Sequence, residues 1–246
     1  NMPKIIKYPE PEKFKCLLES DQIIKLGRRG KYLLFYMTSG YIWVTHLRMT
    51  GQFHYCPQEE PYLKHTHLCF ILDNNYELRY IDIRQFGTMY LLRPEEFNMV
   101  NGLKNLGPEP LEKKFTFKHF CQRLKGKKSN LKQLLLNQAF LAGIGNIYAD
   151  EILFEAGLHP ERNTNTLSHR EKEALYESVR KMLQMGIDNR GTSFRNYVDG
   201  EGKEGSFQKL LRVYGRGGSP CIKCGRPLTK QKIAGRSSCF CSFCQK

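Results

Sequence analysis

The chain has 246 residues, of which 40% are hydrophobic, so it can form one large domain or two smaller domains with packed cores. It contains no apolar run of about 18 residues, which argues against a membrane-spanning helix and a membrane partner. Its formal net charge of +15 favours nucleic acid as the partner ahead of an acidic membrane surface.

The first hundred residues show the pattern of short β-strands. A short helix is predicted first, over 11–18, with Pro11 in its opening turn. Strand-like runs follow at 31–37, 41–47, 67–72 and 77–81. Turn signals separate them at 38–40 and 73–75. Several short strands with tight turns indicate an antiparallel sandwich or barrel.

The segment 106–111 interrupts this pattern, because its two prolines and its glycine do not fit a helix or a strand. Beyond it the pattern becomes helical, at 118–124, 131–137, 147–156 and 168–185. The last of these begins with a capping box, in which Ser168 is followed three residues later by Glu171. The sequence therefore predicts a β domain followed by a helical domain.

A glycine-rich turn separates two of the predicted helices. Gly143 and Gly145 permit a close backbone approach, and Asn146 is a suitable N-cap for a helix from Ile147. A helix N-terminus in this setting is a candidate phosphate site. A plain helix–turn–helix corner needs the same glycines, so this motif alone does not decide between the two interpretations.

The C-terminal stretch contains two Cys-x-x-Cys pairs. Cys221 and Cys224 form the first pair, and Cys241 and Cys244 form the second. This spacing is typical of a structural zinc site, where four thiolates complete a tetrahedron and leave no position for water. A pair of redox dithiols is the alternative. Cys239 could compete with Cys241, but only Cys241 repeats the spacing of the first pair.

The charge of the C-terminal region indicates what it binds, and the remaining cysteines indicate the cellular location. Residues 205–246 carry nine Lys or Arg and no Asp or Glu, so the zinc-held hairpin is expected to contact phosphates. The cysteines outside the two pairs are odd in number and scattered, which favours a reducing, intracellular location.

Several motifs together resemble those of the bacterial formamidopyrimidine-DNA glycosylases. The segment AGIGNIYADE (142–151) resembles the helix–two-turn–helix (H2TH) motif of that family, and the four-cysteine ribbon resembles its zinc finger. Further matches occur in order along the chain: RRGKYL (28–33), HLRMTG (46–51), DIRQFG (82–87), LGPEPL (106–111) and VYGR (213–216). The resemblance covers essentially the whole chain.

The resemblance implies an α+β protein of two domains. The first would be an N-terminal antiparallel β-sandwich or barrel, and the second a helical H2TH domain with a four-cysteine zinc-finger β-hairpin that holds one structural Zn²⁺. The expected boundaries are 1–105 for the β domain, 106–113 for a linker, 114–205 for the H2TH domain with a mobile lid loop at about 191–207, and 206–246 for the zinc finger.

Enzymes of this family turn a damaged base out of the duplex, and a Met, an Arg and a Phe fill the space that it leaves. The matching positions are Met49, Arg84 and Phe86, which we expect to intercalate; without the resemblance, Met49 and Phe86 would be assigned to the core. Arg84 and Phe86 flank a single residue, so in an extended segment they would point to the same side.

Two further sets of residues follow from the resemblance. The phosphate-binding set comprises Lys31, His46, His65, Asn146, Tyr214 and Arg236. The lesion-capping loop comprises Thr192, Arg195, Tyr197 and Gly205. The alternatives are solvated cations, a hydrogen-bonded strand histidine and an ordinary surface loop.

The family's nucleophile is an N-terminal proline followed by a glutamate. Here Lys4 follows Pro3, and the resemblance aligns Asn1 inside the first domain, so Pro3 is not expected to be catalytic. We expect that the chain as given lacks the family's N-terminal segment and glycosylase activity. Lys31 is then the candidate catalytic amine for weak strand cleavage at an abasic site.

The function implied is that of a base-excision-repair glycosylase with DNA-(apurinic or apyrimidinic site) lyase activity. Its substrates would be 8-oxoguanine and formamidopyrimidines in double-stranded DNA. The alternatives are an oxidised-pyrimidine glycosylase of the endonuclease VIII type, and a non-catalytic protein that binds damaged DNA or abasic sites. A monomer in the bacterial cytoplasm, associated with the nucleoid, is expected.

Overall fold

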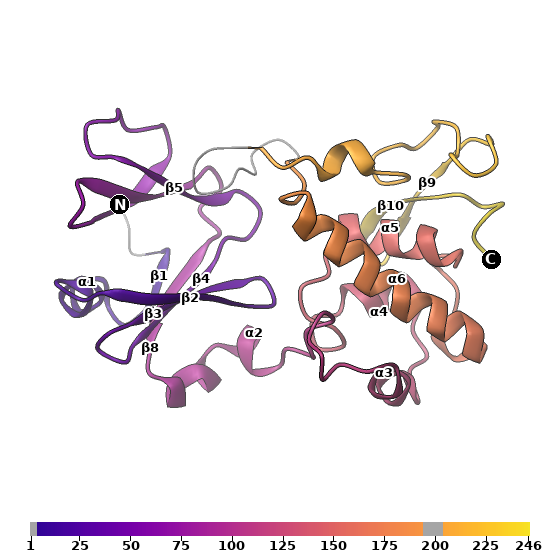
Figure 1. Ribbon diagram of the computed structural model, residues 1–246, viewed down its shortest axis with the longest axis horizontal. Coiled ribbons are helices and arrows are strands. Elements are labelled where there is room, and N and C mark those ends of the chain that lie inside the picture. The colour runs from indigo at the N-terminus through magenta and orange to yellow at the C-terminus, as the bar shows by residue number, and fades with distance from the viewer. Residues whose placement is uncertain (1–3, 194–203) are drawn as a thin grey trace. The chain divides into compact units, whose positions relative to one another are not determined.

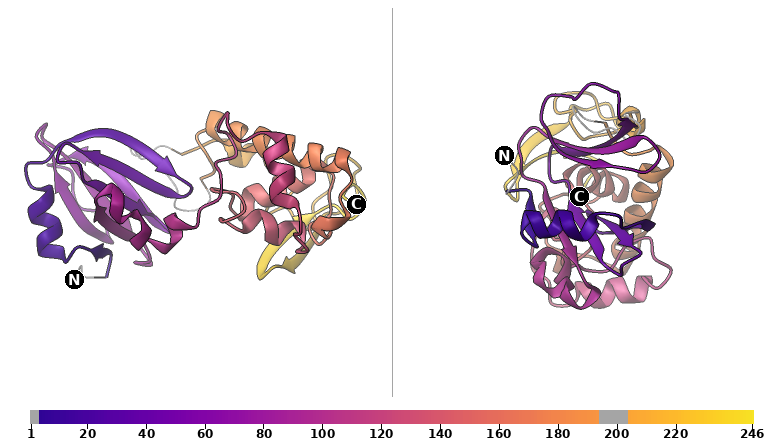
Figure 2. Two further views of the ribbon diagram at one scale, coloured as in Figure 1. Left: turned by 90° about the horizontal axis from the view of Figure 1, so that it is seen from below. Right: turned by 90° about the vertical axis from the view of Figure 1, so that its left-hand side faces the viewer.

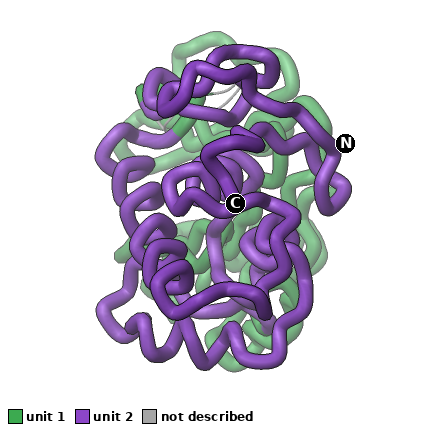
Figure 3. Tube along the Cα trace, turned by 90° about the vertical axis from the view of Figure 1, so that its right-hand side faces the viewer, with its two compact units in different colours: residues 1–104, 192–206 green, residues 105–191, 207–246 purple. Residues whose placement is uncertain are grey.

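The computed structural model describes residues 4–193 and 204–246, and the chain forms two compact units. Unit 1 comprises Asn1–Lys104 and Thr192–Ser206, and unit 2 comprises Asn105–Gly191 and Phe207–Lys246 (Figures 1 and 3). Each unit has a hydrophobic core of its own.

Unit 1 contains two β-sheets, with strand orders β1-β8-β4-β3-β2 and β5-β7-β6. The strands are β1 (Ile6–Tyr8), β2 (Ile23–Arg29), β3 (Tyr32–Met37), β4 (Ile42–His46), β5 (Gly51–Pro57), β6 (Thr66–Ile71), β7 (Tyr76–Asp82) and β8 (Thr88–Leu92). Neighbouring strands run antiparallel except β1 and β8, which run parallel. This pair corrects the prediction of a wholly antiparallel sheet. Because β1 and β8 lie far apart in the sequence, no tight hairpin forces them to run antiparallel.

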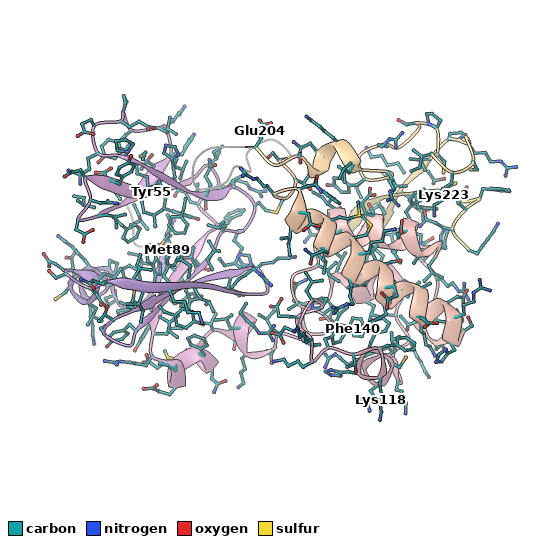
Figure 4. The ribbon with its side chains drawn as sticks, in the orientation of Figure 1. Tyr55, Met89, Lys118, Phe140, Glu204 and Lys223 are labelled. Carbon is teal, nitrogen blue, oxygen red and sulfur yellow. The ribbon has the colours of Figure 1, made fainter. Side chains whose placement is uncertain are left out.

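The two sheets face each other across an aromatic core, as a sandwich requires. Trp43 of β4 stacks on Phe35 of β3 with ring centroids 4.4 Å apart, and Phe53 of β5 meets Trp43 edge-on at 5.6 Å. Helix α1 (Pro11–Leu18) adds Phe14 to the same core. Figure 4 shows Met89 of β8 among these side chains. The predicted β-sandwich and the predicted helix at 11–18 are therefore confirmed.

Four strands of unit 1 were not predicted from the sequence: β1, β2, β5 and β8. Strand β2 contains Gly27, and β5 begins at Gly51 and ends at Pro57. Glycine and proline weaken the local strand signal, so pairing with neighbouring strands decides β2 and β5. The first segment of unit 1, Asn1–Lys104, ends with η1 (Pro94–Met99) and α2 (Asn101–Lys104).

Unit 2 is helical, as predicted. Its elements are α3 (Phe117–Leu124), α4 (Leu131–Leu136), α5 (Asn146–Ala156), η2 (Thr164–Thr166), α6 (His169–Asp188) and η3 (Phe207–Leu210). The capping box of α6 is confirmed: the Ser168 hydroxyl accepts from the Glu171 amide at 3.3 Å, and the Glu171 carboxylate accepts from the Ser168 amide at 2.8 Å. Within residues 4–193 and 204–246, no helix is long and apolar enough to cross a membrane.

A β-hairpin of β9 (Thr229–Ile233) and β10 (Arg236–Phe240) completes unit 2. Its two-residue turn places Ala234 at φ 50° and Gly235 at φ 73°, the left-handed geometry that tight hairpins favour. The hairpin lies beside the helices of the same unit, with β10 next to α5 (Figure 2). Phe140, between α4 and α5, points into the helical core (Figure 4).

Helix α5 is the central element of unit 2, because it is buried along most of its length. Two of its three acidic side chains, Asp150 and Glu151, are inaccessible to solvent. Asp150 forms an ion pair with the buried Lys132 of α4, and its second oxygen accepts from the Cys239 amide of β10 at 3.1 Å. Burial raises the pKa of Asp150 to about 6. The pair thus joins α4, α5 and β10.

Glu151 binds a different part of the chain. Its carboxylate accepts hydrogen bonds from the amides of Arg212, Val213 and Tyr214, at 2.8 to 3.1 Å. These donors would otherwise be buried without partners, which is costly. The single Glu151 side chain therefore holds the segment that leads into the zinc-finger region against α5.

We predict that Glu151→Gln lowers the free energy of unfolding of unit 2 by about 2 kcal/mol, because an amide cannot accept from three converging N–H groups as a carboxylate does. Glu155→Gln, one turn later on α5, is the matched control. Its partly exposed ion pairs with Lys181 and Arg212 should contribute less than about 1 kcal/mol.

The two units can be followed separately in one urea titration. Far-UV circular dichroism reports mainly on the helices of unit 2, whereas Trp43, the one tryptophan of the chain, reports on unit 1. Glu151→Gln should shift the first signal and leave the second in place. Equal shifts for Glu151→Gln and Glu155→Gln would contradict the assigned role.

Candidate nucleic-acid interface and metal centre

The three residues predicted to intercalate lie on two turns of unit 1. Met49 precedes β5, and its side chain is 70% exposed. Arg84 and Phe86 lie between β7 and β8; the ring of Phe86 is 55% exposed, and the Arg84 guanidinium carbon stands 4.7 Å from its centroid. Exposure rules out the alternative that Met49 and Phe86 are core residues. Large apolar side chains held in solvent on turns are typical of contact sites.

The segment that carries Arg84 and Phe86 is not extended, which corrects the reason given for their common orientation. Gln85 adopts the left-handed conformation, with φ 54°, and its amide donates to the Asp82 carbonyl at 3.3 Å. The chain therefore turns between Arg84 and Phe86. The turn, rather than the alternation of a strand, brings the two side chains into contact.

His46 is half-buried at the end of β4. Its Nδ1 accepts a hydrogen bond from the Arg48 amide at 2.9 Å, so the proton of the neutral ring is on Nε2. Burial, together with the positive charges of Arg48 and Lys31, lowers the pKa of His46 to about 4. At neutral pH, His46 can donate one hydrogen bond and carries no positive charge.

Two further members of the predicted phosphate-binding set lie in unit 1. Lys31 is exposed in the two-residue turn that joins β2 to β3, where Gly30 has φ 57°. His65 is half-buried just before β6, also with a left-handed backbone at φ 69°. The His65 carbonyl accepts from the Asp82 amide at 3.1 Å, so this histidine is tied to the turn that carries Arg84.

Asn146 does not cap α5, which corrects the sequence prediction. Gly145 is the N-cap, and Asn146 is the first residue of the helix. The Asn146 side chain instead donates to the Ser237 carbonyl of β10 at 2.9 Å, because β10 lies next to this end of α5. Its buried Oδ1 has no partner among the described residues. Asn146 therefore fixes the hairpin to the helix N-terminus.

The basic residues of the hairpin are accessible. Arg236 is exposed at the start of β10, immediately after the turn. Lys230 and Lys232 of β9, with Gln231 and Ser237, line a depression of about 350 Å³. Tyr214, the remaining member of the phosphate-binding set, is half-buried and is held through its amide by Glu151.

The four predicted metal ligands converge. The sulfurs of Cys221 and Cys244 are 4.0 Å apart, and those of Cys224 and Cys241 are 3.6 Å apart. Four sulfurs around one tetrahedral zinc ion stand about 3.8 Å from one another. The geometry fits one such ion, and Cys239 is not part of the cluster. This clustering favours Cys241 over Cys239 as the fourth ligand.

A second group of metal-ligand type lies in unit 1. The donor atoms of His54, Cys56 and Glu60 lie within 4.8 Å of one another. His54 and Glu60 already form a pair at 2.9 Å, and burial raises the pKa of the Cys56 thiol, which disfavours the thiolate that a metal needs. The neighbouring loop also holds the buried Arg79 guanidinium through the Pro61 carbonyl. We infer no metal there.

The predicted lesion-capping loop is described only at its ends. Gly205 donates from its amide to the Ser193 hydroxyl at 2.8 Å, which links the two ends within unit 1. The hydroxyl of Thr192 is buried without a partner in the described residues. Arg195 and Tyr197 lie outside the described residues.

Comparison with protein-family models identifies all three parts of the chain. The formamidopyrimidine-DNA glycosylase N-terminal domain matches residues 1–89, and the H2TH domain of the same enzymes matches residues 106–197. A zinc finger found in FPG and IleRS matches residues 218–246. Since the first match begins at residue 1, the prediction that the chain lacks the family's N-terminal segment is not confirmed.

Whole-chain relatives and solved structures agree with these matches. The formamidopyrimidine-DNA glycosylase of Heliobacterium modesticaldum is 50% identical over 248 residues, covering 100% of this chain and 90% of the relative. That of Pelotomaculum thermopropionicum is 46% identical over 245 residues, covering 100% and 89%.

Among solved structures, Lactococcus lactis Fpg in complex with abasic-site DNA has a TM-score of 0.91 at 35% identity, covering 100% of this chain and 90% of that one. The MutM (FPG) protein of Thermus thermophilus has a TM-score of 0.87 at 40% identity, covering 94% and 85%. With relatives this similar along the whole chain, the chain belongs to the formamidopyrimidine-DNA glycosylase family.

Proposed function

We propose that the protein is a base-excision DNA glycosylase with lyase activity that removes oxidised purines from duplex DNA. The observation that carries this proposal is the exposure of Met49 and Phe86 beside Arg84, on two turns of a chain that belongs to a glycosylase family. Solved structures of Lactococcus lactis Fpg with Fapy-dG DNA support purine lesions over oxidised pyrimidines. The enzyme names of the relatives disfavour a purely DNA-binding role.

The intercalating residues supply the step that precedes chemistry. A base must leave the stack before an amine can reach its sugar, and the vacated space must be filled. Met49 and Phe86 are apolar and stand in solvent, so they can replace the stacking that the flipped base loses. The Arg84 guanidinium offers donors to the orphaned partner base.

The phosphate-binding residues divide into two chemical classes. Lys31 and Arg236 are exposed cations that neutralise phosphate charge. His46, which is neutral, Asn146 and Tyr214 contribute hydrogen bonds and orientation without net charge. His65 belongs with them as a half-buried donor on a left-handed turn. Affinity would then come chiefly from the cations, and register from the neutral donors.

In the proposed chemistry, an amine attacks the sugar C1′, the glycosidic bond to the base breaks, and the resulting Schiff base allows elimination of the 3′ phosphate. The family places a secondary amine in this role. Among the described residues, Lys31 is the amine that we propose for strand cleavage at an existing abasic site, where its nitrogen condenses with the C1′ aldehyde and releases water. His46 beside it carries no competing positive charge at neutral pH.

We infer that the four-cysteine cluster binds one structural Zn²⁺. Bound there, the ion would complete its coordination with thiolates and fix the positions of β9 and β10. Phe154 of α5 packs in the same cluster as Cys221 and Cys241, so the metal would also stabilise the contact between hairpin and helix. Its role is structural, and the reaction requires no open coordination position.

Borohydride trapping tests the activity. The protein expressed from its complete coding sequence should form a covalent adduct on a duplex that contains 8-oxoguanine, and no adduct on the undamaged duplex. Met49→Ala should slow 8-oxoguanine excision about tenfold or more, since about 1.5 kcal/mol or more of apolar burial is lost. Met99→Ala is the control, because Met99 is also an exposed methionine of unit 1. A uniform loss of affinity for all duplexes in Met49→Ala would contradict the intercalating role.

Salt dependence separates the two classes of phosphate contact. Arg236→Ala should weaken binding to every duplex and reduce the slope of log affinity against log salt by about one, because one released counterion is lost. His46→Gln should weaken binding at neutral pH with the slope unchanged, because His46, with a pKa of about 4, carries no charge to lose. Fluorescence anisotropy over a range of KCl concentrations measures both. A reduced slope for His46→Gln would show that His46 binds as a cation.

Metal content tests the ligand assignment. Zinc measured by plasma mass spectrometry should be about one ion per chain in the wild type and in Cys239→Ser, and should fall well below one in Cys241→Ser. The two cysteines are both buried and stand two residues apart, so they form a matched pair. Zinc loss in Cys239→Ser with retention in Cys241→Ser would reverse the assignment.

A further inference from the structure

Asp82, the last residue of β7, has no role in the proposed chemistry, but its carboxylate is the acceptor for several segments of unit 1. Its side chain is fully buried, and both carboxylate oxygens have two hydrogen-bond donors. Oδ1 accepts from the Thr50 hydroxyl at 2.5 Å and the Arg84 amide at 3.2 Å. Oδ2 accepts from the Tyr80 hydroxyl at 3.1 Å and the Gly87 amide at 2.9 Å.

Three of the four donors belong to the two turns that carry the exposed side chains, and the fourth, the Tyr80 hydroxyl, belongs to β7. Thr50 follows Met49 directly, and Gly87 follows Phe86. The Arg84 amide also donates to the Thr50 hydroxyl at 3.2 Å, so the turns are bonded to each other as well as to Asp82. One carboxylate therefore binds the Arg84 amide and the residues that directly follow Met49 and Phe86.

Two glycines make this convergence possible. A Cβ at Gly87 would stand 1.6 Å from the Tyr80 hydroxyl, and a Cβ at Gly51 would stand 2.3 Å from it. Both distances are far below any atomic contact, so only glycine lets both turns close on the Tyr80–Asp82 pair. The glycines that end the segments 46–51 and 82–87 are thus explained by packing around Tyr80.

The backbone groups of Asp82 also form hydrogen bonds with a third segment. Its amide donates to the His65 carbonyl at 3.1 Å, and its carbonyl is 2.9 Å from the Nε2 of His67. The start of β6 and the residue before it are therefore fixed to Asp82. Burial opposes ionisation, but the hydrogen bonds from Thr50, Gly87, Tyr80 and Arg84 outweigh it and hold the pKa of Asp82 below its ordinary value.

We propose that Asp82 is the positioning residue of the intercalating wedge, defined as Met49, Arg84 and Phe86: its buried carboxylate holds the two wedge-bearing turns as one rigid body. The inference rests on the proposed function. Intercalation must overcome the free energy of unstacking a base step, and a wedge ordered before binding avoids an additional loss of conformational entropy. A carboxylate suits the position because it accepts from all four donors, whereas an amide has one acceptor oxygen.

The test uses Asp82→Asn, which keeps the shape and removes two acceptor positions. The full chain is titrated against a duplex with a tetrahydrofuran abasic analogue beside 2-aminopurine, and against the undamaged duplex. Asp82→Asn should reduce the ratio of the two affinities about tenfold and abolish the rise in 2-aminopurine fluorescence, while affinity for undamaged DNA changes less than about twofold. Asp73→Asn, at an exposed aspartate in the turn between β6 and β7, is the matched control and should behave as wild type.

A double-mutant cycle distinguishes positioning from a merely structural role. If Asp82 acts through the wedge, Asp82→Asn should have little further effect on the affinity ratio once Met49→Ala is present. Additive effects would overturn the inference. Thr50→Val removes the hydroxyl that links Asp82 to the Arg84 amide, and it should lower the ratio by a smaller factor; it decides the question if Asp82→Asn does not fold.

Two outcomes separate this inference from the function on which it rests. Wild type that binds both duplexes equally would refute the proposed function and the inference together. Wild type that discriminates, with Asp82→Asn or Thr50→Val discriminating equally well and losing only thermal stability, would refute the inference alone.

Discussion

Each unit depends on a buried carboxylate that is saturated by hydrogen-bond donors. In unit 2, Glu151 accepts from three consecutive amides, and in unit 1, Asp82 accepts from two turns and from Tyr80. A buried charge is tolerated only when hydrogen bonds replace the lost hydration. The consequence is geometric as much as energetic, because an acceptor surrounded by donors fixes the loops that supply them. Irregular segments thereby acquire the precision that binding surfaces need.

Three residues of the motif NIYADE in α5 bind other parts of unit 2. Asn146 binds the β10 backbone, Asp150 joins Lys132 to the same strand, and Glu151 holds Val213 and Tyr214. A single helix thus positions both Tyr214 and the hairpin that carries Arg236. Zinc would fix the end of the hairpin opposite its turn, where Cys221 and Cys224 precede β9 and Cys241 and Cys244 follow β10. The zinc ion would then help to place the Arg236 cation and would take part in no chemical step. Breaking the Lys132–Asp150 pair would strand a buried charge, which costs several kcal/mol in typical cases.

Much of this arrangement could be predicted from the sequence. The four-cysteine site follows from spacing, the capping box at Ser168 from local pattern, and the helices from periodicity. The strands β2 and β5 could not, because tertiary pairing overrides the glycine and proline within them. Asn146 looks like an N-cap locally, and only the distant Ser237 carbonyl explains its actual role. Asp82 carries no local signal, since its four donors come from both sides of it in the sequence and from another turn. Roles that depend on such long-range convergence require coordinates.

The exposure of Met49 and Phe86 can be understood by comparing the free energy of burying them with that of unstacking a base step. Holding Met49 and Phe86 in water forgoes roughly 1.5–3 kcal/mol of burial for each side chain. Unstacking a base step costs a few kcal/mol, which is a similar amount. Burial of the two side chains between bases can therefore offset the distortion of the duplex, but only if the turns do not also have to be ordered on binding. Backbone ordering costs about 1–2 kcal/mol per residue, so even two mobile residues would cancel much of the gain. An exposed apolar wedge can drive base flipping only when its backbone is already fixed, and in unit 1 the carboxylate of Asp82 is the group that contacts both turns.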